Sequence, residues 1–306
     1  MELLDFKEEE NVIWNVEYNS KQNTLYTTSQ SAYIKTYTIQ NNKLIETKPI
    51  LTPHTRTIRK VKCNKHGMLG CTSFDGTISL IETNQNTILA TLEGHESEVK
   101  GIDWNSTGSM FVSCSRDKAI WIWKSYMGLD FECCSVLTGH TGDVKCVLFH
   151  PNGNILYSGS FDGTIRIWKG EEETEWNEVK SISCDDKTIW DIKNTHDGKF
   201  VVATGANGLI LLYESVDEDL VERDRIVDEK LRDVYSVDII DNLVVVGCGD
   251  NGIRIYRLNV NMKKLFLFQE NKNAHENDVN CVKWLNKTSF VSVGDDNIIK
   301  LWKLQI

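Results

Sequence analysis

Several features of membrane-spanning, disordered and secreted proteins are missing from this sequence. It holds only 3 prolines and 20 glycines in 306 residues, which leaves little room for a long flexible linker. No run of 18 apolar residues occurs, so we expect no helix that spans a bilayer. The segment Met1–Glu10 lacks the basic start and the long apolar stretch of a signal peptide. We therefore expect a globular protein of the cytoplasm or the nucleus.

Positive charge and paired cysteines are also in short supply. Lys and Arg total 34 against 44 Asp and Glu, which gives a net charge of −10. A surface of this sign repels phosphate groups, so direct binding to nucleic acid or to an anionic membrane is not expected. The nine cysteines are odd in number and include no Cys-x-x-Cys pair. This usage favours buried thiols in a reducing compartment, and we expect no resident metal or other cofactor.

The motifs of the common enzyme classes are absent as well. The sequence has no Gly-x-Gly-x-x-Gly, no Walker loop, no His-Glu-x-x-His and no Gly-x-Ser-x-Gly. We therefore expect a protein that is not an enzyme.

What the sequence does contain is one pattern that recurs seven times. Each copy runs from a small residue through a turn to alternating apolar residues that usually end in an aromatic. The clearest copies are Ser115–Trp123, Ser160–Trp168 and Gly294–Trp302. The seven copies end at residues 37, 81, 123, 168, 213, 256 and 302, so that neighbours lie 42–46 residues apart.

Each unit reads as a set of short strands. Asp-Gly and Asp-Asn between apolar runs favour tight turns, and β-branched pairs such as Val144 and Val147 precede each copy. This pattern predicts an all-β fold, a seven-bladed β-propeller that forms a single domain over residues 1–306. By the spacing of the units, the segment Leu3–Phe6 occupies the position of an outer strand that would follow the last unit. We expect it to complete the blade that ends at Trp302 and to close the ring.

Four units carry a His 21 or 22 residues before the acid of the turn. The pairs are His54–Asp75, His95–Asp117, His140–Asp162 and His275–Asp296. This coupling resembles the WD40 repeat, and the resemblance implies that each His hydrogen-bonds to its Asp within one blade. Metal ligation is the alternative for these histidines, although they lie in four separate units.

The residues expected at the mouth of the ring are aromatic and basic. The second residue of the innermost strands gives one set, and the residue before the turn acid gives the other. Together they are Trp14, Arg59, Lys100, Lys145, Trp190 and Tyr235, with Phe74, Arg116 and Phe161. Such side chains dominate protein–protein hot spots, so we interpret them as a partner-binding face. Packing between blades and, for Arg116, pairing with an acid on the rim are the alternatives.

The stretch Glu214–Lys230 holds eight acids and three bases between the fifth and sixth units. We expect a solvated loop here, with docking of a basic partner as the alternative.

A narrower resemblance covers about half of the chain. The runs Leu92–Lys100, Cys114–Trp123, Cys248–Tyr256 and Ala274–Val282 resemble the WD40 proteins of cytosolic iron–sulfur protein assembly, most specifically through Cys114–Lys118. The resemblance implies a scaffold of the targeting complex, beside a small targeting subunit, a helical-repeat subunit and an iron-hydrogenase-like carrier. Such a complex delivers iron–sulfur clusters to cytosolic and nuclear apo-proteins.

The same resemblance implies that Arg116 contacts a partner. Two other functions stay open at this point. One is a WD40 adaptor of another pathway, such as a ubiquitin-ligase substrate receptor or an RNA-processing scaffold. The other is a protein that itself carries an iron–sulfur cluster.

Overall fold

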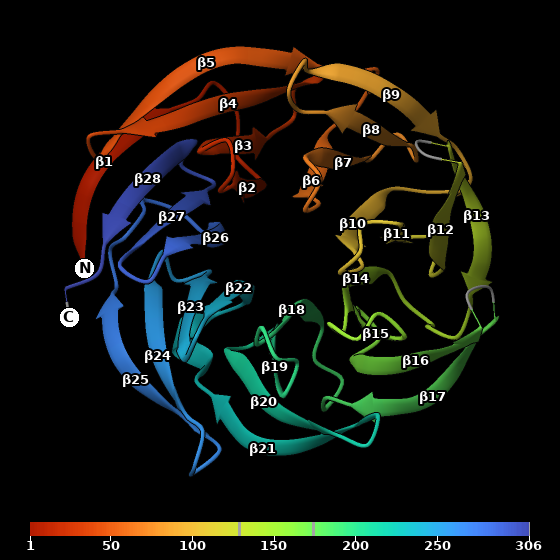
Figure 1. Ribbon diagram of the computed structural model, residues 1–306. Coiled ribbons are helices and arrows are strands. Elements are labelled where there is room, and N and C mark those ends of the chain that lie inside the picture. Colours follow the sequence, from red (N-terminus) through yellow and green to blue (C-terminus); the bar gives the residue numbers. More distant parts are fainter. Residues whose placement is uncertain (128–129, 173–174, 306) are drawn as a thin grey trace.

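The computed structural model describes residues 1–127, 130–172 and 175–305. Seven four-stranded antiparallel sheets surround a central axis like the blades of a propeller (Figure 1). This confirms the all-β, seven-bladed architecture that the repeat predicts. A single turn of 3-10 helix, Glu229–Leu231, is the one helical element among the described residues. No helix in that part of the chain is long and apolar enough to cross a membrane.

Each blade runs from an inner strand beside the axis to an outer strand at the periphery (Figure 1). Blade 1 contains β2 (Asn15–Asn19), β3 (Thr24–Thr28), β4 (Tyr33–Gln40) and β5 (Lys43–Leu51). Blade 2 contains β6 (Ile58–Cys63), β7 (Met68–Ser73), β8 (Ile78–Glu82) and β9 (Thr87–Leu92). Blade 3 contains β10 (Val99–Trp104), β11 (Met110–Ser115), β12 (Ile120–Met127) and β13 (Asp130–Leu137).

The later blades repeat this order. Blade 4 contains β14 (Val144–Phe149), β15 (Ile155–Ser160), β16 (Thr164–Glu172) and β17 (Glu175–Ser183). Blade 5 contains β18 (Ile189–Asn194), β19 (Phe200–Gly205), β20 (Leu209–Val216) and β21 (Asp219–Val227). Blade 6 contains β22 (Val234–Ile240), β23 (Leu243–Cys248), β24 (Ile253–Asn259) and β25 (Lys264–Asn271). Blade 7 contains β26 (Val279–Asn286), β27 (Ser289–Gly294), β28 (Ile298–Lys303) and β1 (Glu2–Glu8).

The hydrophobic core lies between neighbouring blades. Every residue of β7, β11, β15 and β19 is buried, because these strands are covered on both faces. Between blades 1 and 2, for example, Tyr26 and Ile34 pack with Ile58 and Leu69. This two-sided burial accounts for the consecutive apolar residues at the start of these strands, such as Met110–Val112 and Ile155–Tyr157.

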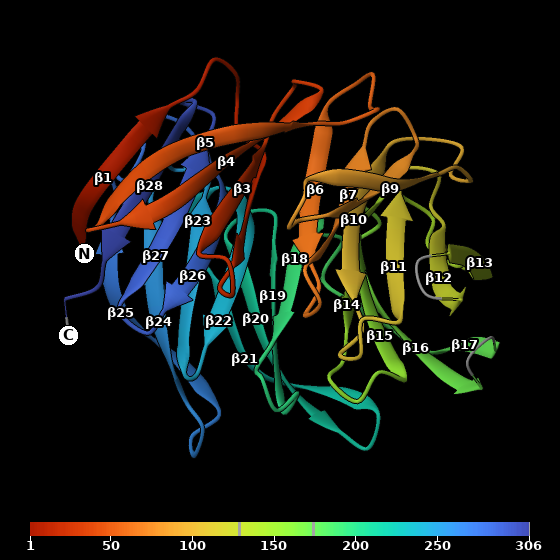
Figure 2. The same ribbon diagram turned by 45° about the horizontal axis from the view of Figure 1, so that its top comes forward.

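The N-terminal strand closes the ring. In β1, which pairs antiparallel with β28, Leu3 lies opposite Trp302 and Phe6 opposite Lys300. The two chain ends therefore meet in blade 7 (Figures 1 and 2). The Asp5 carboxylate also accepts a 2.7 Å hydrogen bond from the Leu44 amide, which ties the closing strand to blade 1. The predicted closure is confirmed.

The prediction of a solvated loop over Glu214–Lys230 is wrong. Most of this stretch forms the outer hairpin of blade 5, with Asp217 and Glu218 at positive φ in the turn between β20 and β21. The Arg223 guanidinium lies 2.8 Å from the Glu214 carboxylate on the adjacent strand, and Leu220 is buried between the blades. Because acids and bases pair across the hairpin, the acidic count of the stretch does not prevent a strand.

Candidate functional site

A repeated β-bulge builds the mouth of the central channel. In six inner strands the pairing shifts directly after the first residue, so the second residue has no partner across the ladder. A bulge turns its side chain away from the regular alternation of the strand. These six bulge residues are Arg59, Lys100, Lys145, Trp190, Tyr235 and Asn280.

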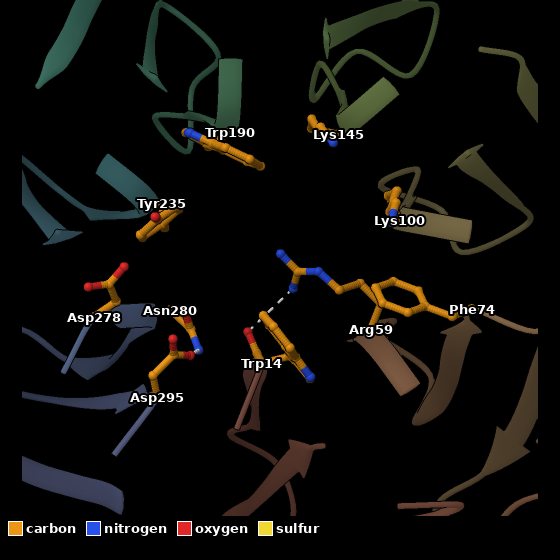
Figure 3. A pocket seen from close by; sticks show the side chains of 10 residues that line it. All are labelled: Trp14, Arg59, Phe74, Lys100, Lys145, Trp190, Tyr235, Asp278, Asn280 and Asp295. Atoms are coloured by element: carbon orange, nitrogen blue, oxygen red, sulfur yellow. Dashed lines mark hydrogen bonds between the residues drawn. The ribbon is translucent and has the colours of Figure 1, made fainter. Parts of the chain in front are cut away.

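The bulge side chains converge on one cavity of about 350 Å³. Trp14 lines it from the segment before β2, Phe74 from the turn of blade 2, and Asp278 and Asp295 from blade 7. Figure 3 shows the basic side chains on one side of this mouth and the two aspartates on the other. The indoles of Trp14 and Trp190 lie between the two sides. The mouth thus combines aromatic walls with separated charges.

Two of the three cations in the mouth already have a carboxylate. The Lys100 ammonium lies 2.5 Å from Glu98 and 4.0 Å from the centre of the Phe74 ring. The Lys145 ammonium lies 3.1 Å from Asp143 and 5.3 Å from the centre of the Trp190 ring. Both contacts orient the side chain over an aromatic face, where a cation–π interaction stabilises it.

The third cation, Arg59, has no such partner. Its guanidinium donates one long hydrogen bond, 3.4 Å, to the carbonyl oxygen of Trp14 (Figure 3). Within the described residues, no carboxylate lies within 4.0 Å of it. Burial lowers the pKa of the Arg59 guanidinium, because the acidic groups around it offset the loss of water only in part.

Arg116 and Phe161 lie on the rim around this mouth and do not line the cavity. The Phe161 side chain protrudes and is 60% exposed. The Arg116 side chain is 58% exposed, and its guanidinium lies 3.7 Å from Glu98. Glu98 also lies 3.2 Å from Arg56, so one carboxylate gathers two exposed arginines and Lys100. The structure therefore brings seven of the nine predicted residues together and places the other two beside them.

The sequence analysis missed the acids of the mouth, although a signal for them exists. Glu98, Asp143, Asp233 and Asp278 each stand directly before the first apolar residue of an inner strand. Each therefore precedes a bulge residue by two positions. The Asp233 carboxylate accepts a 3.0 Å hydrogen bond from the Trp190 indole, which shows that the acids also orient bulge residues of the neighbouring blade. Asp295 occupies the position of Phe74, Arg116 and Phe161 in the last unit.

The four predicted His–Asp pairs lie within single blades. The distance from the His Nδ1 atom to the Asp carboxylate is 3.2 Å in blade 2, 2.7 Å in blade 3, and 2.9 Å in blades 4 and 7. In three blades the other ring nitrogen lies 2.6–2.8 Å from a buried serine hydroxyl, and that hydroxyl accepts a hydrogen bond from a tryptophan indole. These serines and tryptophans are Ser113 and Trp123, Ser158 and Trp168, and Ser292 and Trp302.

Blade 2 and blade 6 satisfy the same turn differently. In blade 2, Cys71 and Ile81 stand where the serine and the tryptophan would be, and the Ser79 hydroxyl lies 2.9 Å from His54 instead. In blade 6, Asp250 has no His and receives two 2.5 Å hydrogen bonds from the Arg254 guanidinium. In both blades a side chain therefore donates a hydrogen bond to the carboxylate of the turn.

The histidines and cysteines do not converge on a common point. Over residues 1–127, 130–172 and 175–305, no group of three or more His, Cys, Asp or Glu side chains could hold a metal ion. All nine cysteines are free thiols. Burial raises the pKa of Cys71, Cys114 and Cys248 to about 12, so these thiols stay protonated at neutral pH.

We expect the protein to lose stability when the pH falls from 7.5 to 5.5. Burial lowers the pKa of His54, His140 and His275 below 6.5, and their aspartates offset this only in part. Below pH 6.5 the unfolded chain therefore binds protons that the folded chain does not. The loss is at most about 1.4 kcal/mol for each histidine, the limit for an imidazole that stays neutral in the folded chain down to pH 5.5, and urea unfolding at both pH values measures it. Equal unfolding free energies at the two pH values would contradict this assignment.

The WD40 signature, described as WD domain, G-beta repeat, matches residues 86–124, 131–169 and 268–303. Each of these segments contains one His–Asp pair together with its serine and tryptophan. The pair His54–Asp75 lies outside them, in the blade where Cys71 and Ile81 replace those two residues.

The chain is also similar to proteins that are named for iron–sulfur assembly. It is 34% identical over 294 residues to "Probable cytosolic iron-sulfur protein assembly protein 1" of Vanderwaltozyma polyspora, with 81% of each chain covered. It is 35% identical over 272 residues to "Probable cytosolic iron-sulfur protein assembly protein CIAO1 homolog" of Caenorhabditis elegans, covering 83% of this chain and 81% of that one. A "Probable cytosolic Fe-S cluster assembly factor" of Schizosaccharomyces japonicus is 32% identical over 95% of this chain, which spans about half (51%) of that protein.

Proposed function

We propose that this chain, which belongs to the WD40 family of cytosolic iron–sulfur protein assembly proteins, acts in the assembly of iron–sulfur proteins in the cytoplasm. The observation that carries the proposal is the 34% identity to an assembly protein over 81% of both chains. The four His–Asp pairs hydrogen-bond within their own blades, which leaves the mouth and the rim as the surface for function.

Within that system the chain serves as a non-catalytic scaffold of the targeting complex. Residues 1–306 act as one domain, and the partners are a small targeting subunit, a helical-repeat subunit and an iron-hydrogenase-like carrier. Together these proteins transfer iron–sulfur clusters to cytosolic and nuclear apo-proteins. The pooling of aromatic and basic side chains on one face supports this role, because such residues carry most of the energy of protein interfaces. The partner-binding face consists of Trp14, Arg59, Phe74, Lys100, Arg116, Lys145, Phe161, Trp190 and Tyr235.

We expect Arg116→Glu to weaken binding of the small targeting subunit at least tenfold, about 1.4 kcal/mol. The Arg116 side chain is more than half exposed and its guanidinium lies 3.7 Å from Glu98, so the reversal changes the surface charge and spares the core. The measurement is calorimetric titration of the purified propeller, wild type and variant, after both have shown the same thermal unfolding midpoint.

Lys65→Glu is the matched control for this experiment. Lys65 is exposed in the turn between β6 and β7, at the opposite end of the inner strand from the mouth. The same charge reversal there should leave binding unchanged. Binding that survives Arg116→Glu would place the contact elsewhere on the propeller. Absence of binding by the wild-type chain would overturn the targeting-complex role and favour an adaptor of another pathway.

A further inference from the structure

Among the described residues, the mouth of the channel holds one cation without a carboxylate partner, Arg59. Arg59 projects from the bulge of β6 into the cavity, whereas Lys100 and Lys145 each lie within 3.1 Å of a carboxylate. Arg59 is half-buried in the cavity, and a partly desolvated guanidinium without an anion costs stability. Such a group is typical of a site that an anion completes.

The surroundings of Arg59 select the class of anion. Its guanidinium lies 5.5 Å from the centre of the Trp14 ring, and Trp190 and Tyr235 pack edge to face, 5.4 Å apart, across the cavity. These rings can bury the methylene stem of a side chain whose polar end reaches Arg59. A planar carboxylate matches the two parallel N–H groups of a guanidinium.

The carboxylate is more suitably a side chain than a chain end. Proteins usually capture a C-terminal carboxylate with several free backbone N–H groups. Around this mouth the amides of Trp14, Phe74 and Asp295 are already committed, to the carbonyls of Thr28, Thr57 and Asp278 at 2.8–2.9 Å. These three amides are therefore not available to an anion, whereas the Arg59 guanidinium lines the cavity without a carboxylate partner among the described residues.

The channel also sets how deep the occupant can reach. Below the mouth, the remaining space lined by Trp14, Arg59 and their neighbours falls to about 30 Å³, which is room for little more than a water molecule. The occupant therefore enters from the face that carries Arg116 and stops at Arg59. A cavity of 350 Å³ accepts one or two side chains at the tip of a protruding loop.

We propose that the mouth receives the acidic side chain of a loop on a partner protein, with its carboxylate paired to Arg59 and its stem between Trp14 and Trp190. This rests on the proposed function only in taking the occupant to be a protein. The partner then presents an aspartate or a glutamate at the tip of a loop.

The test uses two displayed peptide libraries as probes. In one, twelve random residues replace a surface loop of a carrier protein, so that no free chain end is available. In the other, the same twelve residues form the free C-terminus. Both libraries are selected on the wild-type propeller, on Arg59→Gln and on Arg56→Gln. Arg56 is the matched control, because it is an exposed rim arginine that is paired with Glu98.

We expect the wild-type propeller and Arg56→Gln to enrich loops with Asp or Glu at one position, and Arg59→Gln to lose that enrichment. In a selected loop, exchanging that acid for its amide should weaken binding to the wild type at least about tenfold. Arg59→Gln should be no less stable than the wild type, since it removes an uncompensated charge; a clear fall in its unfolding midpoint would instead mark Arg59 as a structural residue.

Two results overturn the proposal. One is selection without any preference for acidic loops, and the other is enrichment of acids only at a free C-terminus. Binding to the small targeting subunit is measured beside the selection. If that binding persists while the loops show no acidic preference, the carboxylate assignment fails and the proposed function stands. If the acidic preference is present and the subunit does not bind, the carboxylate assignment stands and the proposed function fails.

Discussion

Replacing Lys283 with methionine is expected to lower the free energy of unfolding by about 3 kcal/mol. The Lys283 ammonium, on β26, lies 3.7 Å from the Glu17 carboxylate and 3.6 Å from that of Asp238. Glu17 and Asp238 are each only 9% exposed at the side chain. Methionine keeps the length of the side chain but leaves two carboxylates in the channel without their shared cation. Urea unfolding followed by tryptophan fluorescence measures the loss.

Lys283 belongs to a layer of charges that fills the channel below the mouth. The layer holds equal numbers of acids and bases at separations of 3.4–3.8 Å, namely Glu17, Asp103, Asp191 and Asp238 with Lys60, Lys62, Lys193 and Lys283. Burial alone would raise the pKa of Asp191, but Lys193 and Lys60 together with backbone amides lower it to about 2. Only about 20 Å³ of free space remains at this level. The layer therefore fills the channel at this level and carries no net charge.

Two variants separate this effect from a general sensitivity to lysine loss. Lys287→Met removes an ammonium that lies 2.5 Å from Asp241 on the surface, where the two side chains are 74% and 56% exposed. That change should cost less than about 1 kcal/mol. The double variant Lys283→Met with Asp238→Asn restores neutrality and should recover part of the loss. If Lys283→Met costs no more than Lys287→Met, the channel layer is not the stabilising unit that its geometry indicates.

The repeat alone was enough to predict the architecture and the convergence of the mouth residues. A fixed offset from the first apolar residue of each inner strand identifies Lys100, Lys145 and Trp190, and the ring then brings equal offsets to one place. The bulge that aims them is not visible in the sequence. It is a shift in the ladder of six inner strands after the first residue, and only the pairing of two strands shows it.

The sequence analysis did not identify the charge layer, although the same offset argument reaches most of it. Six of its eight members stand four positions after the first apolar residue of an inner strand, and Lys60 and Asp191 stand two positions after it. What the sequence does not show is which charges pair, because all but one of these contacts join residues from different blades. Lys60, for example, lies 3.5 Å from Asp191 across the channel, 131 positions along the chain. The acids Asp278 and Asp295 were within reach of the sequence, because both stand at repeated positions. They were missed because acids in a propeller turn were assigned to the turn itself.

Replacing Asp162 with alanine is expected to destabilise the protein by about 3 kcal/mol. The Asp162 carboxylate accepts hydrogen bonds from the amides of Thr141 and Thr164 at 2.8 and 3.0 Å, and from the Thr164 hydroxyl at 2.7 Å. It also lies 2.9 Å from His140. Alanine leaves these donors unpaired at a site where the carboxylate is only 7% exposed. Urea unfolding at pH 7.5 measures the change.

The pH dependence of the same variant identifies the carboxylate as the cause. Burial opposes ionisation of Asp162, but Thr164, Thr141 and His140 outweigh it and lower its pKa to about 2. Since this folded-state pKa lies below 3.8, the carboxylate contributes stability above about pH 4 and loses it between pH 4 and pH 2. The difference between wild type and Asp162→Ala should therefore shrink over that interval.

Asp197→Ala is the matched control, because Asp197 is an exposed turn aspartate of blade 5 that accepts from Lys199 and Thr195 at 3.1 and 2.6 Å. Its loss should cost about 1 kcal/mol or less, since water can satisfy those donors. A similar cost for both aspartates would mean that Asp162 serves only its local turn. A larger cost for Asp162 means that the chain of bonds through His140, Ser158 and Trp168 holds the blade, and with it the rim residue Phe161, in place.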